Sequence, residues 1–483
     1  MSTEATKISA DSLSDKSITR DATSEPWPSP ARAWYAVFVF ALTLMINMLD
    51  RGIVPLLIGP LKSDLGLSDT QMGLLMGPAF IIVYMILGLP IAMLVDYTSR
   101  RAILGVGVTI WSIMTSICGL AKSFEQLFVC RFGVGSGEAC SGPATFSMLA
   151  DLFPKEKLPR AIAVLNFGFY AGNGLALIIG GTIVQAFANA PPVTLPLIGV
   201  TMRGWQMTFF VIGLPGLIVA ALMATVREPK RRGRISANTN DSTKPVPIRG
   251  VFAFLIKIII AVINNIVAVF TFLSKNKTTF APIFIGMGIQ VVMAYGSLNW
   301  GPAFYGRTFG WTPKEYGLVQ GLITITIMPI GTLFGSILAE RFARAGRDDA
   351  NLRVVLLGKL AALPFGIMFP FMPNAYLAVA VSTIGLFCLS WTAAPLNAAL
   401  QIITPNQMRG QITALFLLVF NVIGFGFGPI LVGLLTDYVF QAESQISYSL
   451  LLTSLILGPL GTFVIWLGMK PYGRSVAEAK AWS

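Results

Sequence analysis

The sequence predicts an all-α integral membrane protein with twelve transmembrane helices in two six-helix bundles. First, 54% of the 483 residues are hydrophobic and only 12% are charged, which is too little charge to cover a soluble protein of this size. Second, the apolar residues form blocks of about twenty or more, the length that crosses a hydrocarbon core ~30 Å thick. Third, similar motifs recur in the same order in both halves of the chain.

Apolar stretches bounded by turn residues and charges give the twelve spans. They are expected at residues 34–59, 70–95, 102–121, 125–150, 161–187, 206–226, 279–300, 316–339, 353–371, 375–402, 410–436 and 446–469. The expected organisation is a disordered cytoplasmic tail (1–30), an N-terminal bundle (31–228), a cytoplasmic linker (229–278), a C-terminal bundle (279–470) and a second cytoplasmic tail (471–483).

One segment of the linker, residues 250–273, is apolar and also long enough to span. Counting crossings back from the basic loop after the eighth span places Lys275 on the same side as Arg249, so the segment returns to the side that it left. Its polar residues recur near helical spacing, as at Lys257 and Asn264. This pattern favours an amphipathic helix in the membrane interface over a thirteenth span or a re-entrant pair.

The distribution of basic residues predicts the orientation. The formal net charge is +13, and most of the 35 Lys and Arg residues fall in loops on one side of the predicted membrane. Basic loops mark the cytoplasmic side, so we expect a multi-pass protein of the cell inner membrane with both termini in the cytoplasm. The same distribution argues against nucleic acid as a partner. The expected partners are the lipid bilayer and a small amphipathic molecule, and we expect a monomer.

The content of cysteine and histidine limits the chemistry. All four cysteines lie within predicted spans (Cys118, Cys130, Cys140 and Cys388), which indicates buried thiols rather than a disulfide framework. The chain has no histidine, so the commonest catalytic base and metal ligand is missing. We therefore expect no enzyme activity, no metal site and no cofactor other than protons as the coupling ion.

Two motifs indicate an internal duplication. Asp96-Tyr-Thr-Ser-Arg100-Arg101 follows the second span, and Glu340-Arg341-Phe-Ala-Arg344 follows the eighth. The fifth and eleventh spans each open with Pro and Arg and continue with closely spaced glycines, at Gly168, Gly172, Gly174 and Gly180 and at Gly424, Gly426, Gly428 and Gly433. Two related six-helix halves are typical of alternating-access carriers, whose substrate binds near the midplane between the halves.

Four charged residues lie inside the predicted spans. Asp50 and Arg51 are in the first span, and Arg131 and Glu138 are in the fourth; we call these four residues the tetrad. Helix rise places Arg131 level with Asp50, and Glu138 about two turns deeper. Such charges are costly in a bilayer and indicate function. The tetrad is neutral, so protonating either carboxylate would leave a positive charge for an anionic head group. The alternative is a static ion-pair network that links two helices.

The C-terminal half offers different side chains. Its seventh, tenth and eleventh spans contain no carboxylate or arginine in their middles, and we expect no cation in its part of the cavity. A cavity with one ionic wall and one aromatic wall fits an amphipathic anion, although each of these residues could instead pack helices. The candidate substrate-binding residues are Arg131, Arg51, Tyr295, Asn299, Trp300, Trp391, Thr392, Asn397 and Asn421.

The loop after the second span resembles the motif that the major facilitator superfamily carries between its second and third helices. Asp96, Arg100 and Arg101 match it, whereas Ala92 and Tyr97 replace its usual glycine and basic residue. The resemblance implies that the acidic residue, the loop arginine and the N-terminal end of the eleventh helix steady the outward-facing state. The implied conformational lock comprises Asp96, Arg100, Arg101, Glu340 and Arg341.

Three further stretches resemble the spinster lipid transporters. They are Asn47-Met-Leu-Asp50-Arg51, Arg131-Phe-Gly-Val-Gly135-Ser-Gly137-Glu138-Ala139 and Ala150-Asp151-Leu152-Phe153-Pro154; the first two also resemble organic anion carriers related to sialin. The resemblance implies that Asp50, Arg51 and Glu138 couple transport to protons. It implies that Arg131 pairs with a carboxylate or the substrate head group, and that the substrate resembles sphingosine-1-phosphate or a lysophospholipid.

Three other functions compete with this interpretation. A carrier of a small hydrophilic organic anion, such as a sugar acid, differs from it by needing a cation in the C-terminal half of the cavity. A membrane enzyme acting on lipid phosphates would need a catalytic cluster without histidine. A non-transporting receptor or scaffold would not need a neutral tetrad in mid-membrane.

Overall fold

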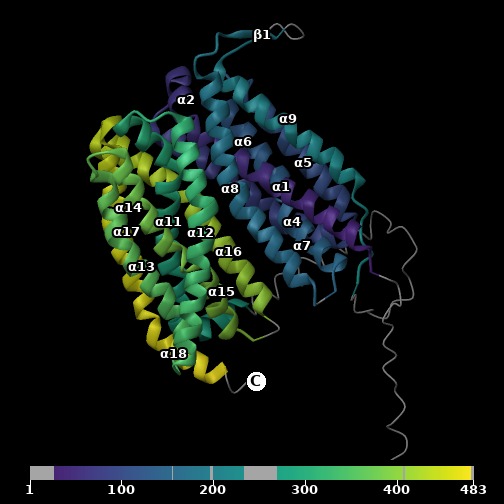
Figure 1. Cartoon of the computed structure of the whole chain (residues 1–483), viewed down its shortest axis with the longest axis vertical. Helices are drawn as coiled ribbons and strands as arrows, with labels where there is room; N and C mark the ends of the chain where they lie inside the picture. Colours follow the sequence, from purple (N-terminus) through teal and green to yellow (C-terminus); the bar gives the residue numbers. More distant parts are fainter. Residues whose placement is uncertain (1–26, 155, 196–199, 233–268, 406–407, 480–483) are drawn as a thin grey trace, which may run out of the picture.

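The computed structural model describes residues 27–154, 156–195, 200–232, 269–405 and 408–479. These residues form two bundles of long helices that lie side by side (Figure 1), one from each half of the chain. The tail expected at 1–30 and the helix expected at 250–273 lie largely outside the described residues; of the latter segment, residues 269–273 are helical.

The N-terminal bundle contains nine helices and one short hairpin among the described residues. In chain order they are α1 (Pro30–Leu56), α2 (Ile58–Leu65), α3 (Asp69–Met76), α4 (Pro78–Tyr97), α5 (Arg100–Cys118), α6 (Phe124–Glu138), α7 (Ser141–Leu152), α8 (Leu158–Ala188), β1 (Val193–Leu195), β2 (Val200–Met202) and α9 (Gly204–Thr225). The strands pair antiparallel, with Val193 opposite Met202. The sequence analysis did not predict them, because three residues are too few to show an alternating pattern.

The C-terminal bundle begins after the linker. Its elements are α11 (Lys277–Phe309), α12 (Pro313–Arg344), α13 (Ala350–Met368), η2 (Phe369–Phe371), α14 (Ala375–Ser390), α15 (Ala393–Ile402), α16 (Arg409–Leu434), η3 (Leu435–Phe440), η4 (Glu443–Gln445), α17 (Ile446–Leu467) and α18 (Met469–Ala479). Helix α18 occupies most of the expected C-terminal tail. It packs onto the bundle through the buried side chains of Tyr472 and Val476.

The predicted all-helical membrane fold is confirmed. Within the described part of the chain, eleven helices are long and apolar enough to cross a bilayer. The predicted fourth span, 125–150, is divided between α6 and α7, which break at Ala139 and Cys140. The tenth span breaks similarly between α14 and α15, and the second between α3 and α4 at Gly77. A Cβ atom on Gly77 would lie 2.2 Å from the carbonyl oxygen of Phe425, so this break brings α16 close.

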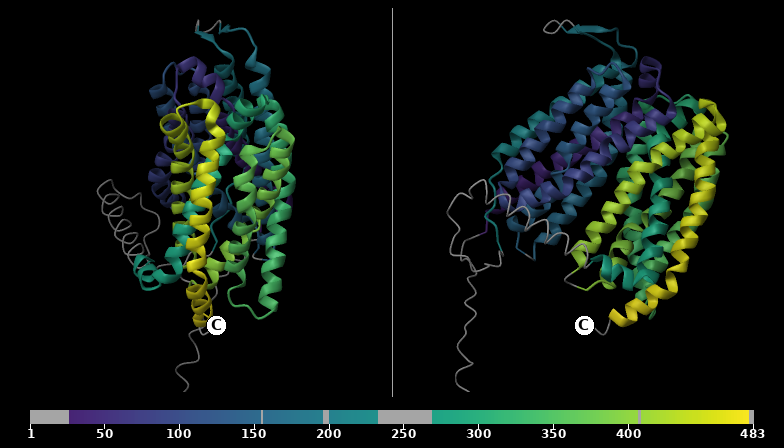
Figure 2. Two further views of the ribbon diagram at one scale, coloured as in Figure 1. Left: turned by 90° about the vertical axis from the view of Figure 1, so that its left-hand side faces the viewer. Right: turned by 180° about the vertical axis from the view of Figure 1, so that it is seen from behind.

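The two bundles contact each other at one end and diverge toward the other (Figures 1 and 2). The contact end carries α2 and the β1–β2 hairpin, and we call it the hairpin end; the opposite end, where α1 begins and α18 ends, is the terminal end. Glycines allow the close approach of helices across this contact. A Cβ atom on Gly73 would lie 2.7 Å from Pro429 O, and one on Gly174 would lie 2.5 Å from Gly321 O.

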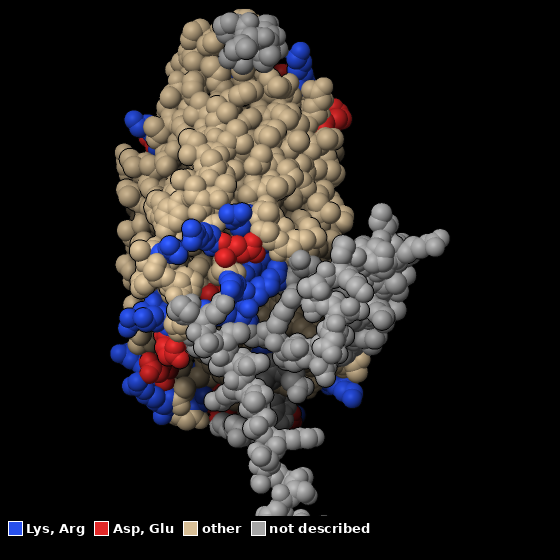
Figure 3. All heavy atoms as spheres, turned by 90° about the vertical axis from the view of Figure 1, so that its right-hand side faces the viewer, with Lys and Arg blue, Asp and Glu red and all other residues tan. Residues whose placement is uncertain are grey.

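Charged residues are concentrated near the ends of the molecule. A space-filling view from the side of the N-terminal bundle shows a broad surface without Lys, Arg, Asp or Glu, with many charged residues below it and few above (Figure 3). Exposed apolar side chains such as Ile86, Ile218 and Phe167 lie on spans of this bundle. A wide uncharged surface between charged ends is the pattern of a protein that crosses a bilayer.

Candidate functional site

The tetrad is assembled between α1 and α6 as two ion pairs. Arg51 donates a hydrogen bond from Nε to Oε2 of Glu138 at 2.8 Å. Arg131 Nη1 lies 3.7 Å from Oδ2 of Asp50. The predicted levels of Arg131 and Asp50 agree with this pairing. The long side chain of Arg51 also reaches the carboxylate of Glu138, although Glu138 lies two turns further along α6.

The tetrad is withdrawn from solvent. The exposed fractions of Asp50, Arg131 and Glu138 are 1%, 2% and 0%. Thr115 of α5 donates a hydrogen bond from Oγ1 to Oδ1 of Asp50 at 2.7 Å. The remaining oxygens, Asp50 Oδ2 and Glu138 Oε1, have no hydrogen-bond partner among the described residues, and neither do Nε and Nη1 of Arg131.

Unsatisfied buried groups of this kind are costly. Both carboxylates therefore keep a free oxygen that can take a proton, and Arg131 keeps donors that can bind an anion. The two ion pairs therefore leave part of the hydrogen-bonding capacity of the tetrad unused by the described residues.

Aromatic rings line the tetrad and connect it to the other bundle. The guanidinium carbon of Arg51 lies 4.5 Å from the ring centre of Phe80 and 5.3 Å from that of Tyr84, both on α4. It also lies 5.8 Å from the ring of Phe425 on α16. Phe425 in turn packs against Tyr295 of α11, with ring centres 4.0 Å apart. Arg51 is thus at the boundary between the two bundles, where a substrate held between them would meet it.

The asparagines of the C-terminal half that are candidate substrate-binding residues form hydrogen bonds within their own helices. Asn299, Asn397 and Asn421 each donate from Nδ2 to the carbonyl four residues earlier, at 2.9, 3.0 and 2.7 Å. The hydroxyl of Thr392 donates to Leu389 O at 2.9 Å. Each amide thus uses one of its two N–H donors within its own helix, and its second N–H and its oxygen stay available to a neighbour.

The two predicted tryptophans differ in position. Trp300 is completely buried, and its indole N–H donates to Pro429 O at 2.8 Å, so it holds α11 against α16. Trp391 stands at the break between α14 and α15 and packs against Phe334 and Phe387. Its Nε1 has no hydrogen-bond partner among the described residues.

The C-terminal half holds a buried cation that was not predicted, in a different place from the cavity between the halves where no cation is expected. Lys359 lies in α13 and is 6% exposed. It lines a cavity inside the C-terminal bundle together with residues of α11, α12 and α14. Lys359 lies in the ninth predicted span, whereas the candidate substrate-binding residues of this half lie in the seventh, tenth and eleventh. An apolar segment of this length tolerates a single lysine without losing its hydropathy signal.

The motif after the second span forms contacts within its own bundle. The side chain of Arg100 is buried and pairs with Asp151 and with Glu228, which follows α9. It also donates to Pro229 O at 2.6 Å. Arg101 donates to Ala224 O at 3.2 Å, near the end of α9.

The other proposed lock residues make fewer described contacts. The side chain of Asp96 lies outside the described residues. In the C-terminal half, Glu340 pairs with Arg344 one turn away, and Arg341 is exposed. Among the described contacts, Arg100 therefore joins helices of one bundle rather than the two halves, and the role of the lock stays a prediction.

The ion pairs of Arg100 with Asp151 and Glu228 lead to a prediction about how the stability of the fold depends on pH. Burial alone would raise the pKa of Glu228, but hydrogen bonds from Ser99 and Arg100 outweigh it and hold the pKa below its ordinary value of 4.5. A carboxylate with a lowered pKa stabilises the fold above its unfolded pKa, and this contribution is lost as the pH falls through the folded value.

We therefore expect Glu228→Gln to lower the melting temperature at pH 7, and the difference from wild type to shrink as the pH falls below 4.5. Thermal unfolding of the purified protein in detergent at a series of pH values tests this. Glu340→Gln is the matched control, because its exposed pair with Arg344 contributes little. An equal difference at every pH would contradict the ionic role of Glu228.

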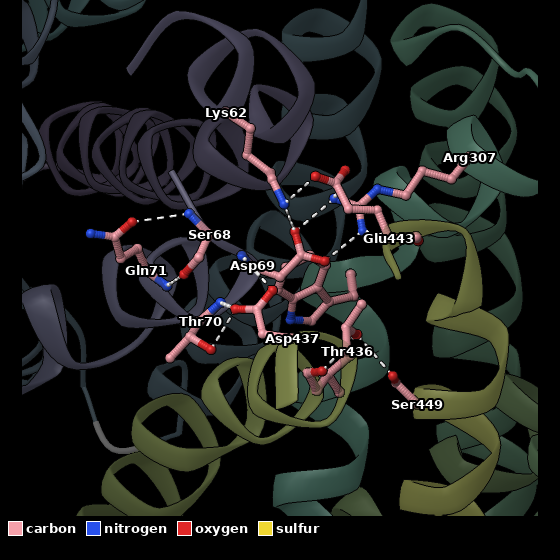
Figure 4. A network of polar contacts seen from close by, with 12 residues as sticks. Lys62, Ser68, Asp69, Thr70, Gln71, Arg307, Thr436, Asp437, Glu443 and Ser449 are labelled. Atoms are coloured by element: carbon pink, nitrogen blue, oxygen red, sulfur yellow. Dashed lines mark hydrogen bonds and ion pairs between the residues drawn. The ribbon is translucent and has the colours of Figure 1, made fainter. Parts of the chain in front are cut away.

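A polar cluster at the hairpin end joins the two bundles and was not predicted (Figure 4). Arg307 of α11 forms a bidentate pair with Asp69 of α3, with both N–O distances at 2.7 Å. Lys62 of α2 contacts Asp69 and lies 2.9 Å from Glu443 Oε1. Asp437 accepts hydrogen bonds from the backbone amides of Asp69 and Thr70, at 3.2 and 2.6 Å, and so caps α3 from the opposite bundle.

We call Lys62, Asp69, Arg307, Asp437 and Glu443 the hairpin-end gate. Its acidic residues come from both halves. Asp69 is 0% exposed, whereas the side chain of Glu443 is largely exposed, so the bidentate pair of Arg307 with Asp69 is the desolvated part of the contact. Sequence reasoning passed over these residues because charges at the ends of spans are usually solvated interface residues. Only the fold shows that positions about 240 residues apart meet.

The comparisons with known proteins agree with this architecture. A family model described as the Major Facilitator Superfamily matches residues 40–429. The chain is 28% identical to an MFS-type efflux pump of Mycolicibacterium smegmatis over 93% of this chain and 95% of that protein. It is 22% identical to a probable L-galactonate transporter of Escherichia coli, over 83% of each.

A solved structure has the same fold. It is a bacterial homologue of the human lysosomal transporter spinster, in an inward-facing and unoccupied conformation. It superposes with a TM-score of 0.72 at 22% identity, over 94% of this chain and 99% of that one. Together with the family match over most of the sequence, the two-bundle helical fold leads to one conclusion: the chain belongs to the Major Facilitator Superfamily of secondary transporters.

Proposed function

We propose that the protein is a proton-coupled carrier of an amphipathic anion of the sphingosine-1-phosphate or lysophospholipid type, and that it works by alternating access. The observation that carries the proposal is the buried neutral tetrad at the boundary of the bundles. Arg51 Nε donates a hydrogen bond to Glu138 Oε2 at 2.8 Å. Asp50 and Glu138 each have one carboxylate oxygen without a hydrogen-bond partner among the described residues. Protonation of Glu138 would release Arg51 to bind an anionic head group.

The surroundings of Arg51 support an amphipathic substrate rather than a fully polar one. Rings of Phe80, Tyr84 and Phe425 surround its guanidinium. Asn299 and Asn421 in the opposite bundle each spend one of their two amide N–H groups on their own helix. A sugar needs many donors and acceptors around its hydroxyl groups, whereas an alkyl chain needs only apolar contacts.

The proposed orientation in the membrane determines which side each end of the molecule faces. With the terminal end in the cytoplasm of a cell inner membrane, as the basic loops predict, the hairpin-end gate closes the outer side. The tetrad is then reached from inside, and the cycle requires the gate residues to separate while the bundles close at the terminal end.

A second candidate function is the transport of a small hydrophilic anion such as a sugar acid. One observation favours it, the sequence similarity to a probable L-galactonate transporter.

The test is a flux assay in liposomes with purified protein. Labelled sphingosine-1-phosphate and labelled galactonate are followed in parallel, with and without an imposed pH gradient. The proposal predicts movement of the lipid at a rate that the gradient changes. If galactonate alone moves, the lipid proposal is wrong and the second candidate function holds. If the lipid moves at a rate that the gradient does not change, the proposed coupling to protons is wrong.

A further inference from the structure

Lys359 is the starting point for an inference about a second site. It lies nine residues after the first residue of α13, which a helical rise places ~14 Å along the helix and near the middle of a bilayer ~30 Å thick. It is 6% exposed and makes no hydrogen bond or ion pair with any described residue. An unpaired ammonium group at this depth is costly to bury.

The cavity that Lys359 lines lies within one bundle. All of its lining residues fall between Gln290 and Ser454, on α11, α12, α13, η2, α14 and α17. It is therefore separate from the tetrad, which is carried by α1 and α6. Its volume is about 140 Å³, which is smaller than a drug-sized site and is room for a head group with only the first part of a chain.

The other polar groups that line the cavity are neutral and can donate hydrogen bonds. Tyr305, Tyr316 and Ser382 contribute hydroxyl groups and Gln320 an amide to the lining. Tyr305 and Ser382 already approach each other, with their oxygens 3.5 Å apart. No carboxylate is among the lining residues. A cation with neutral donors and no counter-charge is the chemistry that binds a carboxylate or a phosphate.

The rest of the lining is apolar. Met293, Leu363, Phe365 and Leu386 are among the side chains that surround the space, and apolar residues are the majority. Such walls add little to the binding of a small hydrated anion, because its remaining polar surface would lose water without compensation. They favour a ligand whose anionic head group carries a hydrocarbon chain.

We infer that this cavity, which we call the Lys359 cavity, is a binding site for the anionic head group and adjoining chain of an amphiphile, with Lys359 as the counter-ion. The site goes beyond the proposed transport function, because every residue that forms it belongs to the C-terminal bundle. It does not depend on proton coupling at the tetrad.

The probe is oleoyl lysophosphatidate, which joins one phosphate to one hydrocarbon chain. The protein is placed in nanodiscs of phosphatidylcholine, and the number and affinity of bound lysophosphatidate molecules are measured by native mass spectrometry. Monoolein has a similar chain without the phosphate, and inorganic phosphate has the charge without the chain. The variants are Lys359→Gln and Lys359→Arg, with Lys314→Gln as the matched control on an exposed lysine of the same bundle.

The expected result is the loss of one bound lysophosphatidate, or a weakening of about tenfold or more, in Lys359→Gln, with binding retained in Lys359→Arg and Lys314→Gln. Arg131→Gln keeps the Lys359-dependent molecule, which separates this site from the tetrad. Unfolding temperatures of all variants verify folding. Two results would overturn the inference: equal binding by Lys359→Gln and wild type, or inorganic phosphate competing as strongly as lysophosphatidate.

Discussion

Glu138→Gln is expected to abolish gradient-driven transport while leaving substrate exchange intact. Glutamine keeps the shape of the side chain and can still accept the hydrogen bond from Arg51 Nε, now 2.8 Å from Glu138. It cannot bind or release a proton. We expect flux driven by a pH gradient to fall by about 100-fold or more, the scale by which rates fall when a proton-transferring side chain is lost.

The measurement compares two modes of transport in the same liposomes. Uptake is driven by a pH gradient in one set, and by exchange against preloaded substrate at equal pH in the other. Glu125→Gln is the matched control, because Glu125 lies on the same helix α6 but is exposed at its beginning. Gradient-driven uptake by Glu138→Gln at the wild-type rate would show that the tetrad is the static network considered in the sequence analysis.

Asp69→Asn is expected to open the hairpin end. The change removes the buried negative partner of Arg307 and Lys62 and leaves both with Glu443, which is largely exposed. Breaking a buried ion pair from one side costs about 3–5 kcal/mol. Since each 1.4 kcal/mol is about tenfold in an equilibrium, the ratio of closed to open gate should fall by at most roughly two to four orders of magnitude, and by less to the extent that Glu443 replaces Asp69 as the partner.

The opening can be measured as a distance between bundles. Spin labels at Lys122 and Tyr376, both exposed and one in each bundle, are placed in a background without the four native cysteines. Asp69→Asn should shift the distance distribution to longer values. Asp64→Asn is the matched control, because Asp64 pairs with Arg203 inside the N-terminal bundle and should leave the distribution unchanged. An unchanged distribution in Asp69→Asn would mean that packing of α3 and α4 against α16 alone holds the halves together.

The features best predicted from the sequence are the apolar spans and the charged residues inside them, because burying charge in a bilayer costs free energy. The positions of the spans follow from apolar length, and Asp50, Arg51, Arg131 and Glu138 were identified because charges inside spans are rare. Their depth along each helix placed Asp50 and Arg131 at the same level, which agrees with the ion pair between them. These features depend on local composition and regular geometry, which a single sequence carries.

Features that depend on contacts between distant segments were missed. Asp69 and Arg307 looked like separate interface charges, because nothing local shows that α3 and α11 meet. Lys359 looked like one polar residue in an apolar span, and only the packing around it reveals a cavity. The break at Gly77 was hidden for the same reason: it follows from the close approach of α16, whose sequence lies in the other half.

Proton movement accompanying the substrate tests the central claim most directly. Liposomes containing the protein and an internal pH-sensitive dye receive sphingosine-1-phosphate without any imposed gradient, and the internal pH is recorded with the lipid flux. The account predicts a pH change that follows the lipid flux in wild type and is absent in Glu138→Gln. Lipid flux with no pH change in wild type would contradict it.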